Sequence, residues 1–240
     1  MAHPPEMPVR IRRFYKNVEV AQVGDGYTIQ LDGRVARTPA GRPLAMPTHA
    51  LADLIRAEWA IQGNEIALAA MPATRLAQTA LDGVADRHAE TVREFARFAE
   101  TDLLCYFAEA PQSLVRREEA VWTPLLGWAR EDLGLAFVRT SGIAHRLQPP
   151  EILASVAALG AAAEPFDLAG LAFGAALFGS AIVVLALRAG RIDAQGALAA
   201  ARLDEMFQEE HWGVDDEAAQ HAARMARETA MLELWFRALT

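Results

Sequence analysis

The first forty residues of the chain alternate between apolar and polar or small side chains, which is the period of a half-buried β-strand. Short glycine turns at residues 24–26 and 32–33 separate the alternating runs. The dipeptide at 32–33 is Asp-Gly, which is favoured in type I′ hairpin turns. The pattern predicts a three-stranded β-meander with the apolar positions Val18, Val20, Val23, Tyr27, Ile29, Leu31 and Val35.

A helical period follows Pro47. Apolar residues recur three or four positions apart from Leu51 to Trp59, Thr48 is a residue type that caps helix N-termini, and Gly63 is placed to end the helix. We expect this helix to cover the meander.

Helical periods continue from Ala73 almost to the end of the chain, after a break at Met71-Pro72. The sequence therefore predicts an α+β protein with a domain boundary at this break. Residues 1–72 would form a small N-terminal domain of β-meander and helix, and residues 73–240 a larger C-terminal orthogonal α-helical bundle. We expect about six to eight helices in that bundle.

Residues 168–187 form an uncharged run of twenty residues, which is long enough to cross a membrane. The run lacks flanking Trp or Tyr and a cluster of basic residues on one side, and it contains three glycines. We therefore favour a helix that other helices surround, capped by Asp167 and interrupted near Gly179-Ser180. The alternative is a membrane anchor.

Composition and charge favour a folded protein of a reducing compartment and disfavour a nucleic-acid-binding protein. The chain has 240 residues, of which 52% are hydrophobic, so it should fold into a substantial core. Its net charge of −8 disfavours a nucleic-acid partner. The single cysteine, Cys105, indicates a reducing compartment, and residues 1–8 lack the apolar segment of a secretory signal. We expect the bacterial cytoplasm.

Catalytic and cofactor signatures are missing from the sequence. It contains no P-loop, dinucleotide fingerprint, nucleophile elbow or His-Glu-x-x-His motif. Cys105 lies among apolar residues with no histidine close in sequence to activate it. Glu217 and His221 are spaced for a metal on one helical face, but the repeated Glu-x-x-His of helix-bundle metal sites is absent. We expect no catalytic residues, no cofactor and no metal.

The most unusual segment is residues 203–215, at the end of a helix predicted to run from Asp193 to Glu210. Its Trp-Gly pair ends that helix, and Asp215 or Asp216 starts another. Core packing explains Leu203 and Phe207, but it does not explain Trp212 beside polar residues, a combination typical of protein interfaces.

Several segments together resemble the assembly chaperones of the F-type ATP synthase that are specific for the alpha subunit, also called assembly factor two. The resemblance spans residue 13 to beyond residue 213. It rests on Arg13-Phe14-Tyr15-Lys16, Leu31-Asp32-Gly33-Arg34, Arg37-Thr38-Pro39, Ala57-Glu58-Trp59 with Gln62, residues 71–77, residues 102–106, and Leu203-Asp204-Glu205-x-Phe207-Gln208 with Trp212-Gly213.

The resemblance implies a two-domain chaperone without catalytic activity, which holds the newly made alpha subunit before that subunit joins beta. It also implies an alphaproteobacterial member, with the mitochondrial matrix as the compartment of eukaryotic relatives. By position, Glu205 is the candidate partner-binding residue, with Gln208, Trp212 and Asp215 as neighbours. An internal ion pair of Glu205 is the alternative role. We expect a monomer without stable membrane insertion.

The residues alone are also compatible with a different class of protein. It is a small-ligand-binding protein or enzyme whose pocket lies between the two domains, lined by Trp59, Met71 and Arg75.

Overall fold

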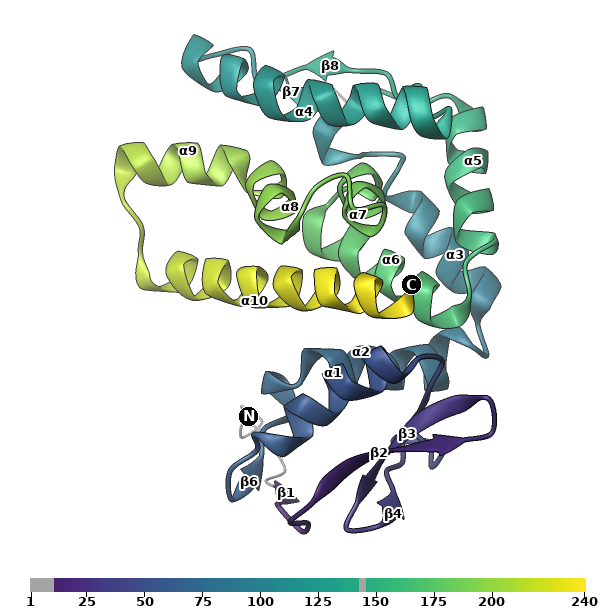
Figure 1. Cartoon of the computed structure of the whole chain (residues 1–240). Coiled ribbons are helices and arrows are strands. Elements are labelled where there is room, and N and C mark those ends of the chain that lie inside the picture. Colours follow the sequence, from purple (N-terminus) through teal and green to yellow (C-terminus); the bar gives the residue numbers. More distant parts are fainter. Residues whose placement is uncertain (1–10, 143–145) are drawn as a thin grey trace, which may run out of the picture.

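The computed structural model describes residues 11–142 and 146–240. The expected lack of a secretory signal concerns residues 1–8, which lie outside the described residues. Within the described ranges the protein is α+β: the largest sheet lies in the N-terminal part, and ten α-helices make up most of the rest (Figure 1). The predicted fold class is confirmed.

The predicted meander forms the N-terminal sheet. Asp32 and Gly33 both have positive φ, 49° and 79°, as a type I′ turn requires, and they join the second and third strands of the meander. A short fourth strand, which we did not predict, pairs with the middle strand. The strands are β2 (Val18–Val23), β3 (Gly26–Leu31), β4 (Arg34–Val35) and β5 (Ala45–Met46), and a separate pair is formed by β1 (Ile11–Arg12) and β6 (Glu65–Ile66).

Helix α1 (His49–Ala60) covers this sheet. The hydroxyl of Thr48 accepts a hydrogen bond from the backbone N–H of Leu51 at 3.1 Å, so the predicted cap is confirmed. The helix ends at Ala60, earlier than expected from Gly63. Its apolar stripe includes Trp59, whose carbonyl accepts from the Tyr15 hydroxyl at 2.8 Å.

Nine α-helices follow in the described part of the chain, one more than the six to eight predicted. The predicted helix from Asp193 to Glu210 is two helices, because the backbone leaves the helical region at Arg202 (φ −111°, ψ 18°). The helices are α2 (Pro72–Thr79), α3 (His88–Arg97), α4 (Gln112–Leu133), α5 (Pro150–Ala161), α6 (Pro165–Phe178), α7 (Ala181–Arg188), α8 (Ala194–Ala201), α9 (Leu203–Trp212) and α10 (Asp216–Leu239). A π-helical turn, η2 (Ala80–Val84), continues α2, and short elements η1 (Leu68–Ala70), η3 (Leu103–Cys105), β7 (Tyr106–Phe107) and β8 (Thr140–Ser141) lie in the connections.

The long apolar run is divided between α6 and α7. Gly179 has φ 64°, and the Ser180 hydroxyl accepts from the Val183 N–H at 3.0 Å, so the predicted interruption is confirmed. The predicted cap at Asp167 is wrong: α6 begins at Pro165, and Asp167 lies in its first turn and binds the Arg188 guanidinium at 2.7 Å. In the described part of the chain, neither half nor any other helix is long and apolar enough to cross a membrane.

The glycines of this run allow close helix packing. A Cβ at Gly174 would lie 2.3 Å from Val184 of α7 and 2.7 Å from Leu232 of α10. A Cβ at Gly170 would lie 2.8 Å from Phe236 of α10. This Gly-x-x-x-Gly spacing therefore serves a contact between helices inside the protein core, as the buried-helix interpretation expected.

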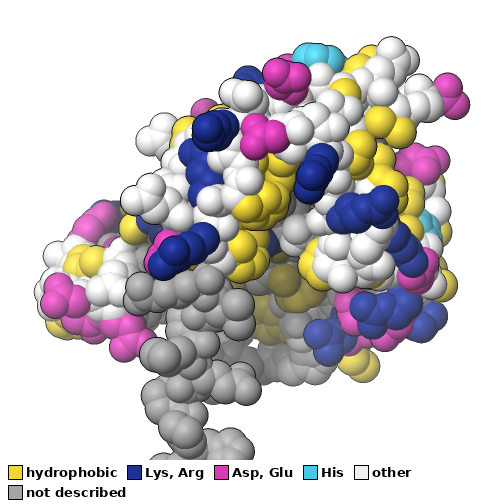
Figure 2. Space-filling view, turned by 90° about the horizontal axis from the view of Figure 1, so that it is seen from below, with side chains coloured by type: hydrophobic (Ala, Val, Ile, Leu, Met, Phe, Trp, Pro, Cys, Tyr) yellow, Lys and Arg dark blue, Asp and Glu magenta, His cyan; other side chains and the backbone are white. Residues whose placement is uncertain are grey.

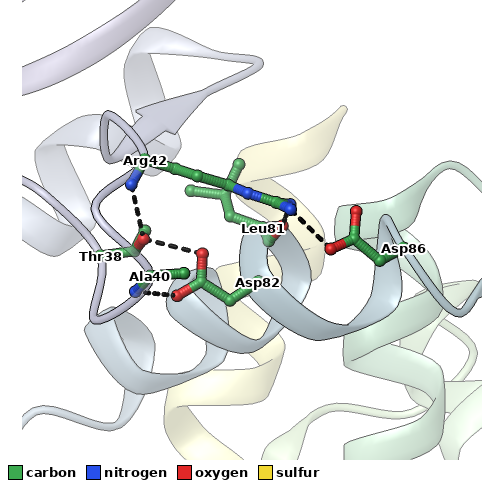
Figure 3. Close-up of polar contacts among 6 residues, drawn as sticks. All are labelled: Thr38, Ala40, Arg42, Leu81, Asp82 and Asp86. Atoms are coloured by element: carbon green, nitrogen blue, oxygen red, sulfur yellow. Dashed lines mark hydrogen bonds and ion pairs between the residues drawn. The ribbon is translucent and has the colours of Figure 1, made fainter.

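A group of polar contacts joins the loop before β5 to the η2 turn (Figure 3). Asp82 accepts from the Thr38 hydroxyl at 2.7 Å and from the Ala40 N–H at 3.0 Å. Arg42 donates to the Leu81 carbonyl and to the Asp86 carboxylate. We call these six residues the η2 clamp. It fixes the π-helical turn to the N-terminal part.

Charge is unevenly distributed over the molecule. On the face seen from below in Figure 2, Lys and Arg side chains lie beside hydrophobic ones across the middle, and acidic side chains lie mostly toward the margins. Residues 203–217 are strongly acidic and contain Asp204, Glu205, Glu209, Glu210, Asp215, Asp216 and Glu217. This acidic segment comprises α9 and the start of α10.

Candidate functional site

Helix α9 is held against α4 by its apolar side. Leu203 and Phe207 are buried, and the Arg117 guanidinium of α4 lies 5.1 Å from the centre of the Phe207 ring. Arg117 also binds both carboxylate oxygens of Glu210, at 2.8 and 2.7 Å. The opposite side of α9 is left to face solvent and α10.

A pair of acids, one fully buried and one half-buried, lies in the same contact. Glu118 of α4 is fully buried, and one of its oxygens accepts from the Ala108 N–H at 2.8 Å. Its other oxygen, and one oxygen of Asp204, are buried without a donor among the described residues. Burial raises the pKa of Glu118 to about 7, with the Asp204 carboxylate adding to the rise, and burial also raises the pKa of Asp204. A proton on one of the two carboxyls would let it donate a hydrogen bond to the other.

Arg202, at the break between α8 and α9, organises the other side of α9. Only 8% of its side chain is exposed. Its guanidinium donates to Glu205 at 2.8 Å and to Glu209 at 2.5 Å. Glu205 is more than half exposed, so it has an internal partner and still presents its carboxylate to solvent.

A groove of about 650 Å³ lies between α9 and α10. We call it the α9–α10 groove; its lining residues are Arg202, Glu205, Gln208, Glu209, Trp212, Gly213, Glu217, Ala218, Gln220, His221 and Arg224. Three of the four predicted site residues, Glu205, Gln208 and Trp212, come together here. Asp215 does not line the groove; its carboxylate caps α10 by accepting from the Ala218 N–H at 2.8 Å.

The end of α9 exposes large apolar side chains. Trp212 is 79% exposed, Val214 55% and Met206 41%. Gly213, with φ 83°, ends α9 and turns the chain toward α10. Trp212 is therefore the last residue of α9, which we call the α9 arm, and lies at its tip. Exposed aromatic residues rimmed by charged ones are typical of protein interaction sites.

In the described part of the chain, no hydrogen bond joins Cys105 to a histidine. Cys105 is buried, and burial raises the pKa of its thiol. His211 Nδ1 donates to the Phe207 carbonyl at 2.7 Å, and His221 Nδ1 lies 2.9 Å from the Arg224 guanidinium. The α9–α10 groove presents carboxylates, an exposed indole and one buried guanidinium.

The alternative pocket between the domains does not form as predicted. Met71 is fully buried and Trp59 is 7% exposed, so both belong to the core. Arg75 is exposed and lines a separate depression with residues of α3 and α6.

Sequence reasoning missed Arg202 and the Glu118–Asp204 pair. Glu118 did carry a signal, because it lies on a helical stripe with Leu114, Trp122 and Leu125, where an acid is unexpected. Arg202 also carried a signal, because Glu205 and Glu209 follow it at i+3 and i+7, the spacing of ion pairs on one helical face.

Comparison with known proteins gives a consistent set of relatives. The family model described as ATP12 chaperone protein matches residues 12–130. The mitochondrial protein atp12 of Schizosaccharomyces pombe is 26% identical over 220 residues, which is 86% of this chain and 75% of that protein. The crystal structure of Atp12 from Paracoccus denitrificans has 37% identity and a TM-score of 0.89, with 96% of this chain and 99% of that chain covered. The Atu1473 protein of Agrobacterium tumefaciens has 41% identity and a TM-score of 0.90, with 95% and 86% covered.

The fold and the relatives together define the class of protein, which is an assembly chaperone. The chain belongs to the ATP12 chaperone family. The function that comes with this family is that of a chaperone in ATP synthase assembly.

Proposed function

We propose that the chain binds the unassembled alpha subunit of the F-type ATP synthase and holds it until it joins beta, and that the α9–α10 groove with the tip of α9 is the contact surface. The observation that carries the proposal is the 79% exposed Trp212, on the same groove as Glu205 and Gln208. A buried Trp contributes a large apolar area to an interface, and flanking carboxylates select a basic partner surface.

The physical role follows from what an unassembled subunit exposes. A subunit outside its complex presents apolar interface that promotes aggregation, and a bound acidic protein covers that surface and keeps the complex dispersed by charge repulsion. Release to beta requires a modest interface with a polar rim. The acidic segment around Trp212 has this composition.

We further propose that the chain acts without catalysis, as a monomer, in the bacterial cytoplasm, and that Asp215 contributes by fixing the start of α10 beside the groove. The domain boundary at residues 72/73 stays a prediction.

The test is suppression of aggregation of the isolated alpha subunit, measured by light scattering. Glu205→Lys should leave folding intact, since Arg202 keeps Glu209 as a partner, and should weaken protection. Glu131→Lys, the same charge reversal at an exposed position of α4, is the matched control and should protect like wild type. Equal protection by all three proteins would remove Glu205 from the contact surface.

A further inference from the structure

A second groove lies between α3 and α6. It consists of two neighbouring depressions of about 310 and 390 Å³, which share Glu94 and Ala172 as lining residues and are therefore continuous. Its apolar lining comes from α6 and from the elements opposite: Leu76, Val84, Phe98, Ala169, Ala172, Phe173 and Ala176. We call it the α3–α6 groove.

Four arginines line the α3–α6 groove. Arg75, Arg87, Arg93 and Arg97 are exposed, and none of their side chains has a hydrogen bond or ion pair in the described part of the chain. Glu94 is the acidic residue of the lining, so the groove carries four positive charges and one negative, a net +3. The chain as a whole carries −8 and offers 31 acidic residues as partners. Arg75 lies close enough to the Glu58 carboxylate to lower its pKa, whereas Arg87, Arg93 and Arg97 have no such partner in the described part of the chain. Guanidiniums free of hydrogen bonds leave binding capacity for carboxylates.

We propose that the α3–α6 groove binds an acidic amphipathic segment of a partner protein, with its apolar side chains on the α6 floor and its carboxylates on the arginines. Arg93 and Arg97 are four residues apart on α3, so their Cβ atoms are about 6 Å apart. Two carboxylate residues one turn apart on a bound helix have the same spacing. The apolar floor favours a peptide over a simple anion, because a simple anion has no apolar side chain to pack against Phe173.

One wall of this groove is fixed before any partner arrives. Gly83 and Val84 of η2 line it, and the η2 clamp ties that turn to the N-terminal part through Asp82 and Arg42 (Figure 3). A preformed site loses less conformational entropy on binding.

The α3–α6 groove is separate from the α9–α10 groove. In Figure 1, α3 and α9 lie on opposite sides of the helical part. The inference therefore goes beyond the proposed function. If the α3–α6 groove binds no acidic segment, the proposed function of the α9–α10 groove is unaffected.

The probe is a fluorescein-labelled peptide of ~14 residues, built from Glu, Leu and Ala at amphipathic helical spacing, with binding followed by anisotropy. Two matched peptides carry Lys for Glu, or Ser for Leu. Wild type should bind the acidic amphipathic peptide, bind the other two at least ~10-fold more weakly, and lose affinity in high salt.

Charge reversal identifies the site. Arg87→Glu with Arg97→Glu should weaken binding of the acidic peptide at least ~10-fold and strengthen binding of the Lys peptide. Arg34→Glu with Arg116→Glu makes the same change in net charge at exposed positions outside the groove and should bind like wild type. Arg75→Gln with Arg93→Gln is a milder second pair, should the first fail to fold.

Three results would overturn the proposal. They are no binding of the acidic peptide by wild type, equal loss in the groove and control variants, or equal binding of the Ser-for-Leu peptide. Capture of the protein by phosphatidylglycerol vesicles through the same arginines, without peptide binding, would assign the groove to a lipid surface instead.

Discussion

Glu118 of α4, which is fully buried, interacts with the half-buried Asp204 of α9, and each acid leaves one buried oxygen without a donor among the described residues. Two unprotonated carboxylates in that position would repel each other in a dry environment. A shared proton converts the repulsion into a hydrogen bond. The attachment of the α9 arm to the rest of the helical part is therefore linked to pH.

The sign of this linkage follows from the pKa of Glu118, which is raised from 4.5 in the unfolded chain to about 7 in the folded protein. Between these values the folded protein holds a proton that the unfolded chain releases. The stabilisation by the pair is complete below about pH 4.5 and is lost as pH rises through about 7.

Glu118→Gln should reduce this pH dependence. We expect the fall in unfolding free energy between about pH 5.5 and 8 to be about 2 kcal/mol smaller in the variant, measured by urea denaturation. Part of the dependence will remain, because burial also raises the pKa of Asp102 to about 6. Glu119→Gln, at an exposed neighbour whose pKa Arg139 lowers, should not flatten the profile. An unchanged slope in Glu118→Gln would refute the shared proton.

Asp102 is expected to be one of the most sensitive positions for stability. Its buried carboxylate accepts from the Ser180 hydroxyl at 2.7 Å and from the N–H groups of Leu104 and Ile182 at 3.1 Å. Asp102→Ala leaves these donors buried and unpaired, so we expect a loss of about 3 kcal/mol in unfolding free energy. Ser180→Ala should cost about 1 kcal/mol, and a smaller loss for Asp102→Ala than for Ser180→Ala would contradict this role.

Trp212 should matter for client binding and not for folding. Because its side chain is 79% exposed, Trp212→Ala should leave the thermal midpoint unchanged. Its burial against a client would contribute about 2 kcal/mol, so affinity for the alpha subunit should fall about 30-fold. Ile61→Ala, at a 78% exposed residue just beyond α1, is the matched control. Equal affinities of the two variants for the alpha subunit would show that the tip of α9 is not part of the contact surface.

The η2 clamp should control local rather than global order. Asp82→Ala removes two hydrogen bonds to residues 38–40 and should cost about 1 to 2 kcal/mol. Amide hydrogen exchange should rise first in residues 38–42 and 80–84, and uniform exchange across the whole chain would argue against a local clamp.

Local backbone chemistry made much of the fold predictable. Asp32-Gly33, Thr48 and Gly179-Ser180 act through contacts within a few residues, and each ends or begins an element where expected. Asp167 misled the prediction, because an acid in the first turn of a helix resembles a cap in sequence. The break at Arg202 was missed because no glycine or proline marks it.

The site was partly predictable for a similar reason. Glu205, Gln208 and Trp212 are spaced along one helix, so their shared face follows from the helical period. The ion pairs of Arg202 with Glu205 and Glu209 follow helical spacing, but its burial does not. That burial, and the pairing of Glu118 with Asp204, depend on how helices pack, which a local pattern does not contain. The four arginines of the α3–α6 groove likewise come from three elements, α2, α3 and the segment after η2.

The most direct test of the central claim is the affinity of the purified chain for isolated alpha and beta subunits, measured side by side by calorimetry. We expect saturable one-to-one binding to alpha, no binding to beta, and no binding to alpha already assembled with beta. Equal binding to both isolated subunits, or binding to beta alone, would contradict a chaperone that holds the alpha subunit.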